Sequence, residues 1–217
     1  MQPDQTLSAI TARALQGVTQ VVEGVEPDVL LVQGDTTTAM TAAMAAFYRR
    51  VPVGHVEAGL RTGDIYNPFP GEGNRRLIST MGTYHFAPTS TARDALLAEN
   101  VAPRQIFVTG NTVIDALRWT VQQPHSLDLD LPLSDGERLI LVTAHRRESF
   151  GPEFESICRA LARIAAENPD TRLVYPVHLN PNVQEPVYRL LGSVPNITLL
   201  PPLDYLPMVH LMRCARL

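Results

Sequence analysis

Acidic, basic and imidazole side chains gather in one irregular stretch, residues 54–76, which reads GHVEAGLRTGDIYNPFPGEGNRR. The stretch leaves an apolar run at Glu57, crosses a loop rich in glycine and proline, and re-enters regular structure near Glu72. Loops on a rigid scaffold are where catalytic groups usually lie. A carboxylate that ends an apolar strand beside glycines has few structural uses. We therefore interpret Glu57 as a general acid or base.

Polar and ionisable groups also follow four other predicted strands at their carboxyl ends, where open parallel sheets bind ligands. The amino ends of the strands carry no comparable set. The sequence therefore predicts that the functional groups lie at the carboxyl edge of the sheets, which we call the rim. The candidate residues on this rim are Asp35, Glu57, Arg61, Asn111, His145, Arg146, Arg147, Glu148 and His178, with Asn74 and Arg75 at the far end of the loop.

Three of these residues also have structural interpretations. Asp35 could serve only as an N-cap that accepts backbone N–H bonds at the start of the next helix. The threonines that follow it could cap the helix equally well and leave its carboxylate available. His145 and His178 could be hydrogen-bonded histidines of the core.

A metal centre is a further alternative, because His55, Glu57 and His85 are residue types that bind zinc. We expect the side chains of His55 and Glu57 to point to opposite faces of their strand, so the sequence predicts no metal site and no cofactor. All eighteen cationic residues are arginine. The absence of lysine excludes Schiff-base chemistry.

Recognition of phosphate is predicted by two features. Arg146 and Arg147 lie at a strand-to-helix turn, where their guanidinium groups could pair with phosphate oxygens. Asp35 and Asn111 follow glycines that open helices, and the N-terminal N–H groups of helices favour anions. Neither a P-loop nor a G-x-G-x-x-G motif is present. We therefore predict a phosphorylated ligand, with carboxylates supplied by a first domain and arginines and histidines by a second.

Composition bounds the remaining possibilities. The 217 residues are 45% hydrophobic and 18% charged, as in ordinary globular proteins. The net charge of -4 and the lack of a basic stripe argue against nucleic-acid binding. Cys158 and Cys214 lie in apolar helical patterns and are interpreted as buried hydrophobic residues. With no signal peptide and no apolar run of about 20 residues, we expect a cytoplasmic protein without a membrane span.

Strands and helices alternate along the whole chain, which predicts an α/β fold with parallel sheets. The expected strands are 28–33, 51–56, 84–87, 106–109, 138–143, 172–177 and 197–200. The expected helices are 4–25, 36–50, 74–81, 89–99, 113–121, 153–167, 182–191 and 205–215.

The pattern lapses between residues 122 and 136, a polar, proline-containing segment typical of a linker. We therefore predict an N-terminal domain at 1–121 and a C-terminal domain at 122–217. Each half has only three or four strands, fewer than a doubly wound sheet usually has. We expect both domains to be truncated, the first at its opening strands and the second at its closing strands. Two small complete domains are the alternative.

Five motifs resemble one known family in order and spacing, over essentially the whole chain. The family is the non-hydrolysing UDP-N-acetylglucosamine 2-epimerases of bacteria. The motifs are VQGDTTT at 32–38, HVEAGLR at 55–61, TGNTVID at 109–115, HRRE at 145–148 and PVHLNP at 176–181. The resemblance implies two Rossmann-like domains of the GT-B type with the active site in the cleft between them. It also implies a homodimer of the full-length protein.

The resemblance further implies interconversion of UDP-GlcNAc and UDP-ManNAc for cell-envelope polysaccharides. A base removes the proton at C2 while UDP leaves C1, and UDP re-adds after protonation from the other face. By similarity Asp35 and Glu57 are catalytic carboxylates, and His145 contacts the UDP side. Arg146 and His178 match positions that bind a second UDP-GlcNAc as an activator in some members.

Two departures from the family pattern affect activity. The family reads Pro-Glu-Glu-x-Asn-Arg where this chain has Gly71 in place of the first, catalytic glutamate. Glu72 is one residue away and is expected to point elsewhere. The chain also lacks counterparts of the family's N-terminal Gly-Thr-Arg-Pro-Glu and C-terminal Ser-Gly-Gly-x-x-Glu-Glu segments. The chain as written is therefore expected to be inactive.

Three rival functions remain open at this point. A hydrolysing epimerase would release free ManNAc and UDP. A GT-B glycosyltransferase would need an acceptor for turnover. A non-catalytic protein that binds sugar nucleotides is the third, and Gly71 is the residue that favours it.

Overall fold

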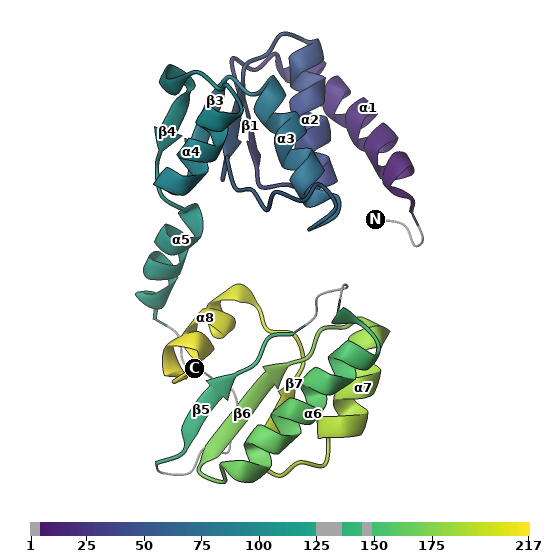
Figure 1. Cartoon of the computed structure of the whole chain (residues 1–217), viewed down its shortest axis with the longest axis vertical. Coiled ribbons are helices and arrows are strands. Elements are labelled where there is room, and N and C mark those ends of the chain that lie inside the picture. The colour runs from purple at the N-terminus through teal and green to yellow at the C-terminus, as the bar shows by residue number, and fades with distance from the viewer. Residues whose placement is uncertain (1–4, 125–135, 145–148) are drawn as a thin grey trace. The chain divides into compact units, whose positions relative to one another are not determined.

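The computed structural model describes residues 5–124, 136–144 and 149–217. The chain forms two compact units, residues 1–114 and 115–217 (Figure 1). The division falls inside helix α5 (Thr112–Val121), whereas the sequence pattern suggested a boundary at the end of this helix. Most of the expected linker, residues 125–135, lies outside the described residues.

The first unit contains a parallel sheet in the order β1-β2-β3-β4, so sequential strands are spatial neighbours. Its register pairs Leu30 with Val53 and Gly54 with Tyr84. The strands are β1 (Leu30–Gln33), β2 (Val53–Val56), β3 (Tyr84–Ala87) and β4 (Ile106–Val108). The helices are α1 (Leu7–Val25), α2 (Thr37–Tyr48), α3 (Gly71–Met81) and α4 (Ser90–Ala98), and a short 3₁₀ turn (Pro103–Gln105) precedes β4.

One face of this sheet is covered by helices. Buried alanines of α2, such as Ala43 and Ala46, allow this helix to pack closely on Val32 and Val53 of the strands. Helix α3 adds Ile78 to the same cluster. A second cluster joins α4 to the ends of β2 and β3. These contacts fix α2, α3 and α4 relative to the strand ends that carry the candidate residues.

The opposite face of the sheet is apolar and exposed. Leu31 is 63% exposed and Phe107 43% exposed, and the Phe107 ring lies 5.8 Å from that of Phe86. Gly54 leaves room on this face for Leu31, whose Cδ2 atom would lie 2.5 Å from a Cβ at position 54. Parallel sheets in proteins usually have both faces covered by helices. This face therefore departs from the usual arrangement.

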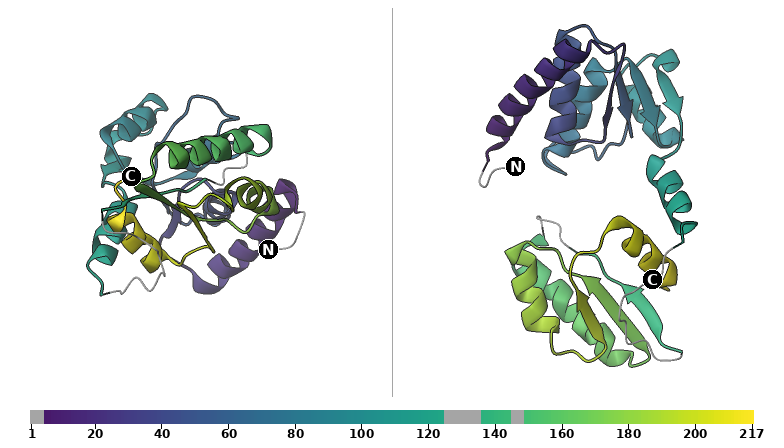
Figure 2. Two further views of the ribbon diagram at one scale, coloured as in Figure 1. Left: turned by 90° about the horizontal axis from the view of Figure 1, so that it is seen from below. Right: turned by 180° about the vertical axis from the view of Figure 1, so that it is seen from behind.

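The second unit has three layers. Its parallel sheet has the order β5-β6-β7. Helices α6 and α7 lie side by side on one face, and α8 lies on the other, as the two directions of view in Figures 1 and 2 show. The strands are β5 (Arg138–Leu141), β6 (Thr171–Pro176) and β7 (Ile197–Leu200), and the helices are α6 (Pro152–Glu167), α7 (Pro181–Leu191) and α8 (Tyr205–Cys214).

Alternate residues of β6 explain this layering. Leu173 and Tyr175 face the core under α6 and α7, while Val174 packs with Leu211 of α8 on the other side. All of these side chains are buried. The second sheet is therefore covered on both faces by the described helices.

The predicted α/β architecture with parallel sheets is confirmed, while several element boundaries and the burial of one cysteine differ. Helix α3 begins at Gly71, three residues before the expected start at Asn74. Cys158 is buried as expected, but Cys214, at the end of α8, is exposed, so the interpretation of both cysteines as buried was wrong. In the described part of the chain, no helix is long and apolar enough to cross a membrane.

Candidate active site

Asp35 and Glu57 follow neighbouring strands and lie at the same edge of the first sheet. The Gly34 N–H donates to the carbonyl of Val56 at 3.1 Å, which ties the two strand ends together. Gly34 has a φ of 72° and Glu57 a φ of 66°, so the backbone turns sharply at both residues. A Cβ on Gly34 would lie 3.3 Å from Glu57 Oε2. The Glu57 carboxylate therefore lies against the turn that carries Asp35.

His55 is hydrogen-bonded to the turn at Gly34. Its Nε2 atom lies 2.9 Å from the carbonyl oxygen of Gly34, and because a carbonyl can only accept, Nε2 carries the hydrogen. The side chain is fully buried, and burial lowers the pKa of His55 to about 4. The ring is therefore neutral near pH 7. The sequence offered this residue only as a possible metal ligand.

The argument against a metal site needs correction. Residues two apart on a strand share a face, so the expectation that His55 and Glu57 point to opposite faces was wrong in principle. In the structure β2 ends at Val56, and the turn at Glu57 takes it out of the strand. His85 is buried beside His55 on β3, and burial lowers its pKa as well. Within residues 5–124, 136–144 and 149–217, no group of three or more His, Cys, Asp or Glu could hold a metal ion.

Asp35 is held by helix α3 and does not cap α2. The Thr36 side chain caps α2 by accepting from the Ala39 N–H at 3.1 Å. Asn74 Nδ2 donates to the Asp35 carbonyl at 2.8 Å, and Arg75 Nη2 lies 2.6 Å from Asp35 Oδ2. Asn74 and Arg75, expected to bind substrate, are thus brought directly to Asp35.

Gly71 adjoins the same carboxylate. A Cβ at position 71 would lie 2.8 Å from Asp35 Oδ2 and 3.4 Å from Pro68 Cγ. The space beside Gly71 that a side chain would enter is therefore occupied by the Asp35 carboxylate. This position is the one at which the chain departs from the family motif.

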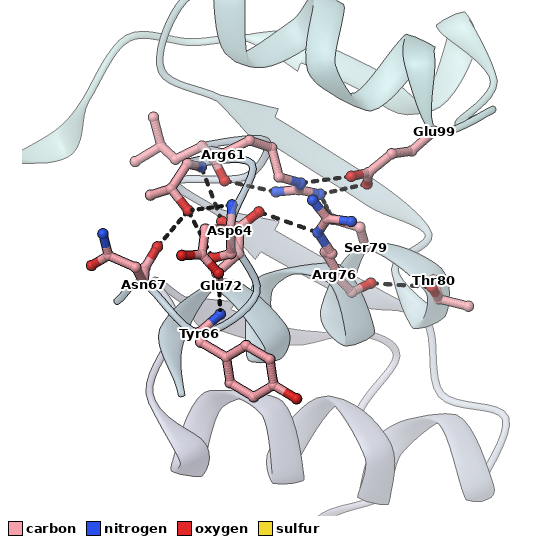
Figure 3. A network of polar contacts seen from close by, with 11 residues as sticks. Arg61, Asp64, Tyr66, Asn67, Glu72, Arg76, Ser79, Thr80 and Glu99 are labelled. Carbon is pink, nitrogen blue, oxygen red and sulfur yellow. Dashed lines mark hydrogen bonds and ion pairs between the residues drawn. The ribbon is translucent and has the colours of Figure 1, made fainter. Parts of the chain in front are cut away.

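Glu72 is fully buried and is directed to the loop instead of to Asp35. Its Oε2 atom accepts from the Thr62 N–H at 3.2 Å, and its Oε1 atom accepts from Arg76 Nε at 3.2 Å (Figure 3). Each of its oxygens has a partner. Glu72 therefore supports the loop, and no contact places it beside the two candidate acid/base groups.

The guanidinium of Arg61 is bonded within the protein. It donates from Nε and Nη2 to both oxygens of Glu99, at 2.8 and 2.6 Å, and from Nη2 to Ser79 Oγ at 2.9 Å (Figure 3). Its Nη1 atom donates to the carbonyl of Leu60. The hydrogen bond from Arg61 lowers the pKa of Glu99. Arg61 was expected to bind substrate, but these contacts give it the role of tying the loop to α3 and α4.

A set of side chains that the sequence did not single out shapes the loop between Arg61 and α3. Thr62 Oγ1 donates to the carbonyl of Asn67 at 2.5 Å, and Asp64 Oδ1 accepts from the Tyr66 N–H at 2.9 Å (Figure 3). The Tyr66 and Phe69 rings stack at 6.4 Å on the surface. Thr and Asp at turn positions were the available signal.

Asn111 lies at the end of β4. Its side-chain oxygen accepts from the Val113 N–H at 3.1 Å at the start of α5. Gln33, the last residue of β1, donates to Thr112 Oγ1 at 3.4 Å. Asn111 therefore has a role in forming the turn, on the same rim as Asp35.

In the second unit, His178 follows β6 and is exposed. Its Nδ1 atom accepts from the Asn180 N–H at 3.1 Å, and Asn180 in turn caps α7. His178 is thus not a core histidine. His145, Arg146, Arg147 and Glu148 lie outside the described residues. The buried Tyr175 hydroxyl donates to the carbonyl of Ala144, which anchors the backbone just before them.

The chain is similar over its whole length to proteins of one family. The family model described as UDP-N-acetylglucosamine 2-epimerase matches residues 1–217. Enzymes of this name from Salmonella typhimurium and Escherichia coli are each 55% identical to the chain over 99% of its length. The chain spans 59% of the length of each of these relatives.

Solved structures show the same fold. The UDP-GlcNAc 2-epimerase of Neisseria meningitidis, crystallised with UDP-GlcNAc, has a TM-score of 0.94 and 43% identity over 99% of this chain and 60% of its own. The Methanocaldococcus jannaschii enzyme, in complex with UDP-GlcNAc and UDP, has a TM-score of 0.81 and 28% identity, covering 99% of this chain and 60% of its own. The fold is thus that of two Rossmann-like units of the GT-B type, and the chain belongs to the UDP-N-acetylglucosamine 2-epimerase family.

Proposed function

We propose that the full-length protein containing this chain interconverts UDP-GlcNAc and UDP-ManNAc by inverting C2 of the sugar. The observation that carries the proposal is the pair of carboxylates, Asp35 and Glu57, on adjoining strand ends. Relatives with the same fold were crystallised with UDP-GlcNAc. As part of the same proposal, the protein acts in the cytoplasm as a homodimer and supplies cell-envelope polysaccharide synthesis.

The chemistry needs two acid/base groups near C2. One carboxylate takes the C2 proton, the C–H electrons form a C1–C2 double bond, and the C1–O bond breaks with its electron pair leaving on UDP. In the second half of the reaction a proton is delivered to the other face of C2 and UDP re-adds at C1. Asp35 and Glu57 are the groups that we assign to these transfers.

The remaining roles are assigned by resemblance. We assign His145 to the UDP side of the ligand, and Arg147 and Glu148 to ligand binding. Arg146 and His178 are assigned to a second, activating UDP-GlcNAc. The phosphate-binding capacity of paired arginines supports this assignment.

Gly71 is the reason to expect little activity from the natural sequence. It places no carboxylate beside Asp35, and Glu72, the next residue along the chain, is bonded to Thr62 and Arg76. This feature also favours a second candidate, a protein that binds UDP-GlcNAc without turnover. Binding of UDP-GlcNAc without exchange of the C2 hydrogen is the behaviour expected of that candidate.

The test joins residues 1–217 to the flanking segments of the Neisseria meningitidis enzyme and follows exchange of the C2 hydrogen in D₂O. We expect slow exchange with Gly71 and about a hundredfold faster exchange in Gly71→Glu, since a positioned acid/base group contributes 10²–10⁴-fold. Equal rates would show that position 71 is not a catalytic position. Phosphorus NMR separates the rivals, because UDP released in stoichiometric yield identifies a hydrolase and contradicts the proposal.

A further inference from the structure

Helix α3 begins with two adjacent pairs of positions four residues apart, 71 with 75 and 72 with 76. Residues four apart lie on the same helix face and can pair. At 72 and 76 this pairing is made, with Glu72 Oε1 at 3.2 Å from Arg76 Nε. At 71 and 75 the first position is glycine, so the corresponding pair is not made.

Arg75 is directed to Asp35 instead. Its Nη2 atom lies 2.6 Å from Asp35 Oδ2, and its side chain is 14% exposed. The Nε atom of Arg75 is buried and, within the residues that the structure describes, has no hydrogen-bond partner. A buried donor without a partner is unfavourable, and a nearby acceptor would satisfy it.

Position 71 is where such an acceptor would come from. A Cβ there would be 2.8 Å from Asp35 Oδ2, so a side chain at 71 must displace the Asp35 carboxylate. A carboxylate on that side chain would be four residues before Arg75, with the same spacing as the observed pair of Glu72 and Arg76. Negative charge in the first turn is also favoured by the helix dipole.

We propose that Arg75 is a positioning residue with two alternative carboxylate partners, and that glycine at position 71 commits it to Asp35. A carboxylate at 71 takes the Nε–H of Arg75, and the Cβ at that position displaces the Asp35 carboxylate from its present place beside Nη2. Position 71 thereby controls the orientation of Asp35 as well as the number of carboxylates. The inference deepens the proposed function, since Asp35 is one of its acid/base groups, but the pairing can be measured without turnover.

The test uses NMR of the 217-residue chain, following the Arg75 Nε–H and the Asp35 carboxyl carbon. Arg75→Gln assigns the first signal by its loss, and Asp35→Asn assigns the second. In Gly71→Glu we expect the Arg75 Nε–H signal to move downfield and its exchange with water to slow about tenfold, as a charge-assisted hydrogen bond forms. The Asp35 carboxyl signal should move in the same variant.

Two controls separate pairing from crowding and from charge. Gly71→Ala adds the Cβ without an acceptor, so the Asp35 signal should move while the exchange rate of the Arg75 Nε–H stays as in the parent. Gly73→Glu adds the same carboxylate at a position whose Cβ has only Ile65 Cγ1 nearby, at 3.7 Å, and should leave both signals unchanged. An unchanged Arg75 signal in Gly71→Glu, or an equal change in Gly73→Glu, overturns the proposal.

A variant that leaves position 71 untouched keeps the proposal testable if Gly71→Glu does not fold. Asp35→Asn removes the charge of the present partner, and we expect the Arg75 side-chain N–H groups to exchange faster by about tenfold, because the charge-assisted bond is lost. Unchanged exchange would overturn the pairing. The two proposals can fail separately. If the Arg75 NMR signal moves in Gly71→Glu but the joined enzyme with Gly71→Glu does not exchange the C2 hydrogen, the pairing stands and the proposed function is contradicted.

Discussion

At the scale of single residues, His55 lies where the two turns with the proposed acid/base residues Asp35 and Glu57 meet. It precedes Glu57 by two residues and donates to the carbonyl of Gly34, the residue before Asp35. Because the ring is buried and its pKa is lowered to about 4, it is a neutral donor near pH 7. Protonation of His55 would place a positive charge on a ring that is buried away from water.

The first prediction concerns the pH dependence of stability. The unfolded chain binds a proton at His55 as the pH falls below about 6.5, while the folded chain stays neutral there until about pH 4. The free energy of unfolding should therefore fall between these values, by about 2 kcal/mol from pH 7 to pH 5 for His55 alone. The lowered pKa of His85 acts in the same direction.

His55→Gln keeps an N–H donor but does not titrate, so its urea midpoint should fall less than that of the parent between pH 7 and pH 5. Equal slopes in the parent and His55→Gln would contradict the assignment of the titration to His55.

Sequence reasoning placed Asp35 and Glu57 on one rim, because both end apolar strands and parallel strands share a carboxyl edge. It did not predict the partners of the arginines. Arg61 follows a strand as the other candidates do, yet its guanidinium bonds to Glu99, thirty-eight residues along the chain. Whether an arginine faces a ligand or a protein carboxylate depends on packing of α4, which local sequence does not encode.

At the scale of elements, the loop after β2 is fixed by its close approach to α4. Gly59 has a φ of 84°, and a Cβ there would lie 2.2 Å from the backbone carbonyl oxygen of Ala92. Gly63, in the same loop, has a φ of 85° but nothing within 4 Å of its Cβ position. The two glycines share a backbone conformation and differ in their surroundings.

The second prediction uses this matched pair. Gly59→Ala should lower the free energy of unfolding by about 3 kcal/mol, since it adds left-handed strain and a backbone clash. Gly63→Ala should cost only about 1 kcal/mol, because strain alone applies. Chemical denaturation of the two variants measures both values. Equal costs would show that the packing of Gly59 on α4 is not tight.

The types of the elements followed from the sequence more readily than their boundaries, and the start of α3 is an example. Prolines and glycines between residues 68 and 73 suggested a loop up to Asn74. Helix α3 nevertheless begins at Gly71, with Pro70 as its N-cap residue. Local propensity could not show that contacts of Asn74 and Glu72 would hold this glycine-containing turn in a helix.

At the scale of the whole molecule, the two sheets differ in their covering. The second sheet has described helices on both faces, whereas the first presents Leu31, Tyr84 and Phe107 to solvent. The apolar run at residues 28–33 is typical of a strand buried on both faces, yet Leu31 of β1 is exposed. Large exposed apolar patches favour association.

The third prediction is that the 217-residue chain associates through this face at high concentration. Leu31→Arg should shift the sedimentation profile toward the monomer. Leu179→Arg, which changes a leucine that is 68% exposed in the second unit, is the control and should leave the profile as in the parent. A parent chain that sediments as a monomer at every concentration would contradict the prediction.

The contrast between Cys158 and Cys214 makes the chain a ready substrate for site-specific dyes. Cys214 is open to solvent, whereas Cys158 is buried and its thiol has a raised pKa. A maleimide therefore attaches at Cys214 without mutagenesis. Cys214 lies in the second unit, so a dye attached there reports on that unit without any change to the sequence.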